Sequence, residues 1–198
     1  MSLPALLVAL SLAQSSTYEA PELPNRTPPV VPLYLPQAVY VGAFLNDALL
    51  TPQVRLQWEW NLVRTHHDAF VFYAEGGGGY AISFPHNLGA TGQDAMQYFY
   101  EHTVEAGIAY RAVYENGFAW GFHVGTGPVF YGARIQNAPT ENFLTGWVEG
   151  GAQIGLKAGP VVYGLALRYA NLYDPPRHST AGLYVGGFNL SLYAEWRP

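Results

Sequence analysis

Acidic and basic side chains recur along this chain at positions that alternate with apolar ones. The acids are Glu59, Glu75, Glu101, Glu105, Glu149 and Glu195, and the bases are Arg55, Arg111, Lys157 and Arg168. Such groups could pair with one another, or they could line a cation-preferring pore or a small-solute site. Because an unpaired charge is strongly unfavourable in a narrow interior, we expect a structural network of ion pairs, and we expect His123 to join it.

Two adjacent histidines, His66 and His67, directly precede Asp68. Imidazole and carboxylate groups are ligands for divalent transition metals. A solvated turn accounts for the same three residues, and we therefore expect no metal site. His86 and His178 lie in segments with the composition of loops, and we interpret them as polar loop residues.

Composition and motifs disfavour other chemistry. The absence of Cys removes disulfides, thiol catalysis and thiolate metal sites. No HExxH, Gly-x-Ser-x-Gly, P-loop or Rossmann fingerprint is present. A net charge of -5 provides no basic field for nucleic acid. We therefore expect no cofactor and no nucleic-acid partner, and the sequence favours a non-enzymatic protein over an enzyme.

The spacing of the charged residues indicates β-strands, because a strand sends alternate side chains to opposite faces. In residues 53–63 one phase is Gln53, Arg55, Gln57, Glu59 and Asn61, and the other is Val54, Leu56, Trp58, Trp60 and Leu62. The charged residues named above all fall on the first kind of phase. This pattern predicts eight strands, at residues 38–46, 53–63, 68–84, 98–114, 117–131, 143–157, 160–172 and 181–196.

The connections between these segments alternate in length. The expected long connections are residues 47–52, 85–97, 132–142 and 173–180, and the expected tight turns are 64–67, 115–117 and 157–160. Short turns on one rim and longer loops on the other are typical of outer-membrane barrels, as is an even number of strands.

The small residues indicate which face points inward. The charged phase also contains Gly77, Gly79, Ala81, Gly107, Ala109, Gly125, Gly127, Gly151 and Gly155. These suit a narrow lumen, and a charged content of 12% is low for a solvated sheet, against about 25% in soluble domains. We predict an all-β fold, an eight-stranded antiparallel up-and-down transmembrane β-barrel with the charged phase inside. The alternative is a soluble lipocalin-like ligand carrier, which would bury the apolar phase.

The first 37 residues differ in composition from the rest. Residues 1–13 contain a short apolar run that ends in small residues, which predicts a signal peptide. Residues 14–37 contain six prolines, which predict an extended periplasmic leader or a disordered tail. The barrel is expected over residues 38–198.

Over residues 38–196 the eight strands, the inward charges and the final Trp196 resemble small eight-stranded outer-membrane proteins of the OmpA and OmpX kind. The closing segment, residues 190–196, is similar to the aromatic-ended assembly signal of such proteins, although Arg197 and Pro198 follow the aromatic residue. The resemblance implies the bacterial outer membrane as location, with outer-membrane lipid and lipopolysaccharide as partners.

A second resemblance is to the PagL-type lipid A deacylases. Their seventh strand ends in an Arg-Tyr pair followed by His-x-Ser-Asn, and a Glu on the last strand completes a hydrolytic triad. Here Arg168-Tyr169 is followed by Ala170-Asn171-Leu172-Tyr173, so neither the base nor the nucleophile is matched. The resemblance implies the fold without that activity.

Together these observations predict a non-enzymatic outer-membrane barrel with a mostly closed, ion-paired lumen. Its four longer loops are expected to have structural or recognition roles, with a protein, a glycan or lipopolysaccharide as contact. Residues 85–87, 137–139 and 174–178 are the segments that we expect to make such contacts. A deacylase-like membrane enzyme and a small pore remain the alternatives.

Overall fold

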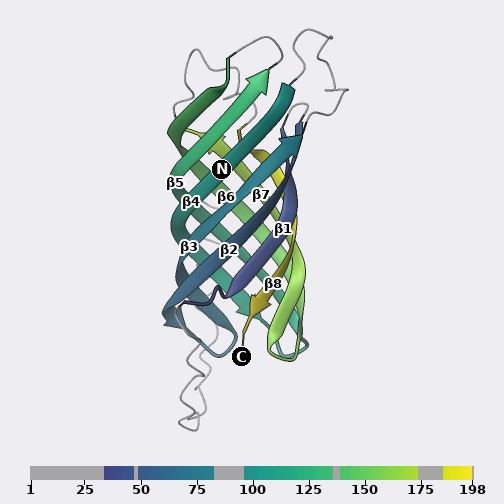
Figure 1. Ribbon diagram of the computed structural model, residues 1–198. Helices are drawn as coiled ribbons and strands as arrows, with labels where there is room; N and C mark the ends of the chain where they lie inside the picture. The colour runs from purple at the N-terminus through teal and green to yellow at the C-terminus, as the bar shows by residue number, and fades with distance from the viewer. Residues whose placement is uncertain (1–33, 47–48, 83–95, 136–138, 174–184, 198) are drawn as a thin grey trace, which may run out of the picture. The chain divides into compact units, whose positions relative to one another are not determined.

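The described residues form one closed barrel of eight antiparallel strands. The computed structural model describes residues 34–46, 49–82, 96–135, 139–173 and 185–197. Each strand pairs with its neighbour in the chain, and β8 pairs with β1 to close the sheet (Figure 1). The strands are β1 (Ala38–Asn46), β2 (Leu49–Arg64), β3 (Asp68–Ile82), β4 (Met96–Val113), β5 (Phe118–Ile135), β6 (Glu141–Ala158), β7 (Val161–Leu172) and β8 (Gly187–Trp196). The predicted fold class is confirmed.

In the described part of the chain, we find no helix of the length and apolarity needed to cross a membrane. The expected signal peptide and most of the expected leader lie outside the described residues.

The side chains alternate between lumen and outer wall as the sequence predicted. In β2, Arg55 is 2% exposed, whereas Val54 and Leu56 on either side are 51% and 36% exposed. In β7, Arg168 is 1% exposed, whereas Leu167 and Tyr169 are 53% and 49% exposed. The apolar phase therefore covers the outer wall. A soluble carrier would bury that phase, so this alternative is wrong.

Several strands differ in length from the prediction. β2 begins at Leu49, so only residues 47–48 separate it from β1, and the long connection expected at 47–52 is wrong. Pro52 does not end the strand, because it pairs with Ala43 of β1 at a point where the ladder with β3 has not yet begun. A residue without an N–H is tolerated where a strand has a partner on one side only.

The connection between β5 and β6 is also shorter than expected. β5 continues to Ile135 and β6 begins at Glu141. Residues 136–140 therefore join them, in place of the predicted 132–142. β8, by contrast, begins at Gly187, later than the predicted residue 181.

Tight turns gather at one rim, which we call the short-turn rim. Residues 65–67 join β2 to β3, residues 114–117 join β4 to β5, and residues 159–160 join β6 to β7. Gly117 and Gly159 have φ values of +83° and +60°, which side-chain-bearing residues rarely adopt. The opposite rim, the long-loop rim, carries the connections at 83–95 and 174–184, whose residues lie outside the described part of the chain.

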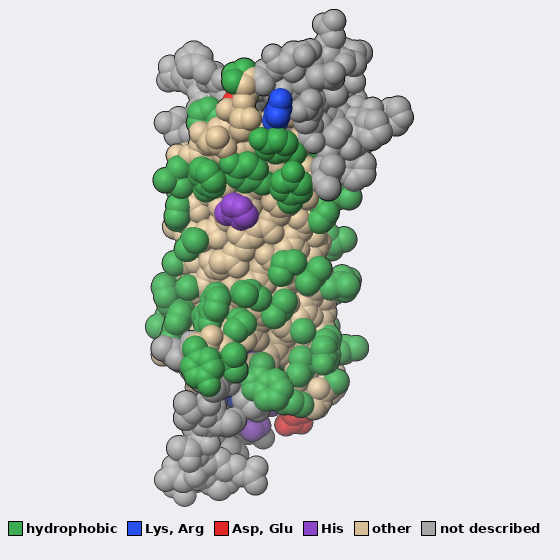
Figure 2. All heavy atoms as spheres, viewed as in Figure 1, with side chains coloured by type: hydrophobic (Ala, Val, Ile, Leu, Met, Phe, Trp, Pro, Cys, Tyr) green, Lys and Arg blue, Asp and Glu red, His purple; other side chains and the backbone are tan. Residues whose placement is uncertain are grey.

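The outer wall is apolar, with aromatic residues toward its two ends. Figure 2 shows hydrophobic side chains gathered near both ends of the wall in view, with a band of sparsely covered backbone between them. Near the long-loop rim, Tyr98 stacks between Tyr80 and Tyr100, at ring-centroid distances of 6.3 and 6.4 Å. Near the short-turn rim, Tyr110 contacts Trp120 and Phe122. Two such belts are typical of membrane barrels.

Some charged residues within strands lie on the outer face, contrary to the one-sided pattern. Arg134, near the end of β5, is exposed on the same phase as Phe130. Asp68, the first residue of β3, shares the phase of Phe70 and accepts a hydrogen bond of 2.9 Å from the Tyr110 hydroxyl. Both charges lie at strand ends, where a membrane wall meets the polar interface.

Candidate functional site

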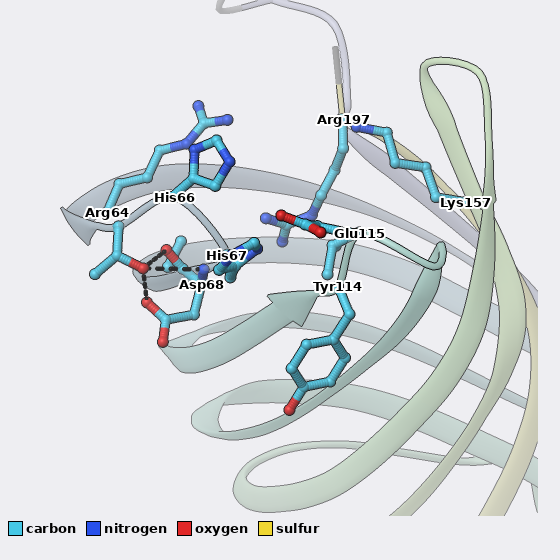
Figure 3. A pocket seen from close by; sticks show the side chains of 11 residues that line it. Arg64, His66, His67, Asp68, Tyr114, Glu115, Lys157 and Arg197 are labelled. Carbon is cyan, nitrogen blue, oxygen red and sulfur yellow. Dashed lines mark hydrogen bonds between the residues drawn. The ribbon is translucent and has the colours of Figure 1, made fainter. Parts of the chain in front are cut away.

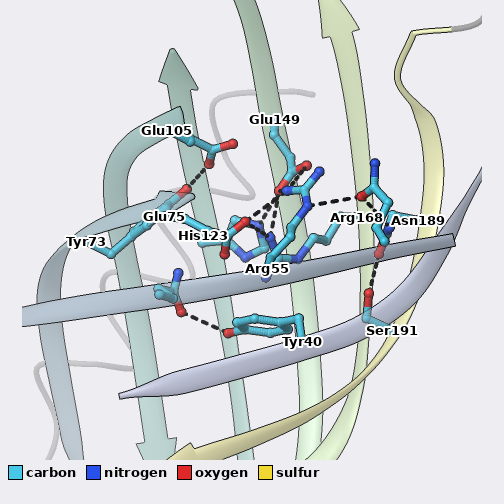
Figure 4. A network of polar contacts seen from close by, with 12 residues as sticks. Tyr40, Arg55, Tyr73, Glu75, Glu105, His123, Glu149, Arg168, Asn189 and Ser191 are labelled. Atoms are coloured by element: carbon cyan, nitrogen blue, oxygen red, sulfur yellow. Dashed lines mark hydrogen bonds and ion pairs between the residues drawn. The ribbon is translucent and has the colours of Figure 1, made fainter. Parts of the chain in front are cut away.

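Four charged side chains in the middle of the lumen form a closed ring of ion pairs (Figure 4). Arg55 Nη1 lies 2.9 Å from Glu75 Oε1 and 2.8 Å from Glu149 Oε2. Arg168 Nη1 lies 2.7 Å from Glu75 Oε1 and 3.0 Å from Glu149 Oε1. One residue each comes from β2, β3, β6 and β7, so the contacts cross the lumen. We call these four residues the lumen ring.

Inward glycines leave the space that the two arginines occupy. Gly77 faces Arg55 in the β2–β3 register, and a Cβ at Gly77 would lie 2.5 Å from Arg55 Cγ. Gly151 faces Arg168 in the β6–β7 register, and a Cβ there would lie 3.0 Å from Arg168 Cγ and 2.7 Å from His123 Cε1. The small residues of the charged phase thus make room for the long side chains beside them.

Aromatic rings pack against both arginines of the lumen ring. Arg55 Cζ lies 5.1 Å from the ring centroid of Phe44 and 5.0 Å from that of Trp147. Both aromatic residues belong to a buried apolar cluster toward the long-loop rim, which also contains Leu49, Phe99, Val129, Tyr131, Leu172 and Val185. On another side, Arg168 Cζ lies 4.0 Å from the Tyr40 ring centroid. Cation–π contacts of this kind are worth about 2 kcal/mol when desolvated.

A second group of ion pairs lies toward the short-turn rim. Arg111 Nε lies 3.2 Å from Glu59 Oε1, and Arg197 Nη2 lies 3.3 Å from Glu59 Oε2. Arg197 also pairs with Glu195 through its Nε. Arg197 thus supplies a base that the sequence analysis did not assign. Its position two residues after Glu195, on the same phase, was a signal that could have found it.

Lys157 does not lie in the lumen as expected. Its side chain is exposed at the short-turn rim, beside the turn between β6 and β7. A side chain at the end of a strand can reach water past the last turn, so strand phase alone does not decide its position. Arg197 takes the place of Lys157 as the fourth base.

The remaining predicted residues have neutral or weaker contacts. Glu101 accepts a hydrogen bond from Gln53 Nε2, and Glu105 accepts one from the Tyr73 hydroxyl. His123 Nε2 lies 3.5 Å from Glu149 Oε1, at the edge of the lumen ring. For Glu101 and Glu105, the described contacts include no ion pair with a base.

Neutral side chains connect the middle of the lumen with the short-turn group. The Tyr40 hydroxyl donates to Gln57 Oε1 at 2.9 Å and lies 3.1 Å from Gln153 Oε1. Gln153 Nε2 in turn donates to Glu195 Oε2 at 3.2 Å. Only charged side chains were assigned to the lumen network from the sequence. The roles of Tyr40, Gln57 and Gln153 in that network were therefore missed, although all three residues follow the inward phase.

This packing leaves little free space beside the short-turn group. The void lined by Arg111, Gln153, Tyr193 and Glu195 is too small to hold a water molecule. The lumen ring itself contains two positive and two negative groups, so its charges cancel locally. Such an arrangement can hold strands together across the lumen and obstruct passage through it.

The other histidines in the described part of the chain lie away from the lumen. His66 and His67 are exposed in the turn between β2 and β3, and His102 is exposed on the outer wall. His86 and His178 lie outside the described residues. Among the described residues, His66, His67 and Glu115 form the one group with metal-binding potential.

No serine hydrolase site is visible in the described part of the chain. Ser191 is its only serine, and this buried hydroxyl donates to Asn189 Oδ1. Ala170 and Leu172, at the positions where PagL-type enzymes have His and Ser, are buried on the lumen side of β7.

Comparisons with known proteins place the fold. No family model matches the chain. No curated protein matches it either. Among solved structures, it is similar to the outer membrane enzyme PagL, with 15% sequence identity, a TM-score of 0.52, and coverage of 81% of this chain and 99% of the other. It is also similar to Ail, the attachment invasion locus protein of Yersinia pestis, with 12% identity, a TM-score of 0.49, and coverage of 80% and 93%. The chain has the fold of small eight-stranded outer-membrane barrels.

Proposed function

We propose that this protein is a non-enzymatic barrel of the bacterial outer membrane that spans the bilayer with a closed lumen and presents its longer loops for structural or recognition roles. The lumen ring is the observation that carries the proposal. Arg55 and Arg168 each bridge Glu75 and Glu149, and their guanidinium groups fill the space between opposite walls. A pore would need that space for ions and water.

The outer wall supports membrane insertion. Large apolar side chains such as Val124, Leu165 and Leu192 are 50%, 47% and 67% exposed on the wall. A contiguous apolar surface around a whole barrel is unfavourable in water and favourable in the hydrocarbon of a bilayer. Outer-membrane lipid and lipopolysaccharide are accordingly the proposed partners of the wall.

Membrane insertion is tested by cell fractionation together with gel migration of unheated and heated samples. We expect the full-length chain to partition with the outer membrane and to migrate differently once heating unfolds the barrel. Recovery in the soluble periplasmic fraction, with no heat-dependent migration, would contradict the proposal.

The non-enzymatic role is tested with lipid A, the substrate implied by the sequence resemblance to PagL-type deacylases. The purified protein in detergent is incubated with lipid A, and the products are analysed by mass spectrometry, with a lipid A deacylase as positive control. Because Ala170 and Leu172 stand at the positions of base and nucleophile, we expect the acyl chains to remain attached. Release of a fatty acid would instead support a membrane enzyme.

The recognition role is tested by replacing the loops one at a time. The chain offers residues 83–95 and 174–184 for this purpose, and each can be exchanged for a short Gly/Ser linker that leaves the strands unchanged. We expect loss of binding to lipopolysaccharide-containing vesicles while heat-dependent migration is kept. Equal vesicle binding by both variants and the unmodified protein would exclude these loops as the recognition surface.

A further inference from the structure

Two neighbouring turns at the short-turn rim bring three metal-ligand side chains together (Figure 3). His66 and His67 come from the turn between β2 and β3, and Glu115 comes from the turn between β4 and β5. One ligand atom of each residue lies within 4.8 Å of the other two. In Figure 3 both imidazole rings and the carboxylate border the same pocket, whose volume is roughly 330 Å³.

The histidine turn is held in place by its neighbours. Thr65 N donates to Asp68 O at 2.8 Å, and the Thr65 hydroxyl bonds the Asp68 carboxylate. Asp68 Oδ2 also accepts a hydrogen bond of 2.9 Å from the Tyr110 hydroxyl, and this bond anchors the turn to β4. The Asp68 carboxylate is therefore engaged on both oxygens, and it supports the turn instead of facing a metal.

The glutamate turn is fixed as well, and it is tied to the histidine turn. Val113 N donates to His67 O at 2.7 Å, which joins the two turns directly. Asn116 Oδ1 accepts from Phe118 N at 2.9 Å, and Gly117 provides the positive φ that the turn requires. The three ligands are thus carried on backbone whose arrangement does not depend on a bound ion.

The ligand chemistry selects a borderline divalent ion. Two neutral imidazoles and one carboxylate suit Zn²⁺, Ni²⁺ or Cu²⁺, and His₂Glu with an open fourth position is a recurrent zinc set. Zinc–ligand bonds of about 2.0–2.1 Å require ligand atoms roughly 3.4 Å apart. The three ligand atoms lie within 4.8 Å of one another. Side-chain rotations that move these atoms by about 1 Å would bring them to the separation that zinc requires.

Charges around the pocket oppose a cation and limit the affinity. Arg64, Lys157 and Arg197 also line it. Arg197 is engaged with Glu59 and Glu195, which offsets its charge. Arg64 and Lys157 are exposed, so water and salt screen them. The site is therefore expected to be weaker than one with an acidic surround.

We propose that His66, His67 and Glu115 form a binding site for one divalent transition-metal ion, of which Zn²⁺ is the representative, at the short-turn rim. The site is independent of the lumen ring and of the loops at the opposite rim. It requires only that the barrel is folded.

The test is calorimetric titration of the full-length, untagged protein, refolded in detergent, with ZnCl₂ in a non-coordinating buffer. We expect one zinc ion per chain, and an affinity at least about tenfold lower in His66→Ala, His67→Ala and Glu115→Gln, because each removes one of three protein ligands. Heat-dependent migration shows that each variant still folds. Unchanged affinity in all three variants would overturn the proposal.

Matched controls separate this site from other histidines. His86→Ala/His178→Ala and His102→Ala are expected to bind zinc like the unmodified protein, and loss of binding in either would overturn the proposal. Lys157→Ala is expected to raise the affinity a few-fold, because it removes a positive charge beside the ion. A lower affinity in Lys157→Ala would contradict the assigned position. The Cu²⁺ complex should show nitrogen hyperfine coupling from two imidazoles in its electron paramagnetic resonance spectrum, and a spectrum without it would count against the assignment.

Discussion

Arg55 and Glu149 lie 94 residues apart in the chain, yet Arg55 Nη1 is 2.8 Å from Glu149 Oε2 across the lumen. β2 and β6 are not neighbours in the sheet, so no backbone ladder places these groups together. The contact exists because the sheet is closed and narrow, and because Gly77 leaves room for the arginine side chain. The Arg55–Glu149 contact therefore depends both on closure of the barrel and on packing inside its lumen.

Removal of one arginine from the lumen ring should destabilise the barrel. Arg55→Met leaves Glu75 and Glu149 facing each other in the lumen without one of their two bridging cations. Breaking a buried ion pair in this way costs about 3–5 kcal/mol. The free energy of unfolding, from urea titration in lipid vesicles, should fall by this amount. Arg64→Met, at the exposed short-turn rim, should change it by less than about 0.5 kcal/mol, and equal effects of the two substitutions would contradict a role for the ring.

Removal of both partners should be less harmful than the sum of the single losses. In Arg55→Met/Glu149→Met the unpaired charges that the single variants leave behind are both removed. Residues in contact typically show coupling energies of about 0.5–3 kcal/mol. A double-mutant cycle on the free energy of unfolding measures this term. Additive effects within about 0.3 kcal/mol would mean that the two side chains do not interact.

Adjacent glycines on β3 should differ in their tolerance of a methyl group. A Cβ on Gly77 would lie 2.5 Å from Arg55 Cγ and 2.6 Å from Val54 O, whereas a Cβ on the outward Gly76 meets nothing closer than 4.0 Å. Gly77→Ala should therefore cost about 1–3 kcal/mol through overpacking. Gly76→Ala should be neutral or stabilising. The reverse order of the two urea midpoints would show that the faces of β3 are assigned wrongly.

A charge on the outer wall should be costly in the middle of the barrel and tolerated near its ends. Val124→Arg places a guanidinium near the middle of β5, where a membrane barrel pays about 2–4 kcal/mol. Leu156→Arg, two residues before the end of β6, should cost about 0–1 kcal/mol. The two residues are 50% and 64% exposed, so exposure does not distinguish them. Equal and small costs in vesicles would argue against a lipid-facing wall.

The alternation of side chains made the fold predictable from sequence. Arg55 lies between Val54 and Leu56, and Arg168 lies between Leu167 and Tyr169. The two faces of each strand can therefore be identified from adjacent residues in the sequence. The inward direction followed from the glycines that share the charged phase. The ends of strands were less predictable, because Pro52 looks like a strand breaker and is tolerated only through its one-sided pairing.

The partners within the lumen could not be predicted from the sequence. In the ladder, Glu75 faces Glu105, a like charge, yet its ion pairs reach Arg55 on the neighbouring strand and Arg168 across the barrel. Cross-lumen contacts depend on register and closure of all eight strands, which local patterns do not encode. Strand phase also failed at the rim for Lys157, whose side chain is exposed to water, whereas Arg197 follows the inward phase of Glu195 and pairs with it.

The closed lumen is tested most directly by electrical recording from the full-length protein in planar lipid bilayers. A general porin reconstituted in the same way shows that insertion would be detected, and protease accessibility of the bilayer-inserted protein shows that it is present. Because Arg55, Arg168, Glu75 and Glu149 occupy the middle of the lumen, we predict no steady single-channel conductance. Reproducible conductance steps from the folded, unmodified protein would contradict a lumen closed by ion pairs.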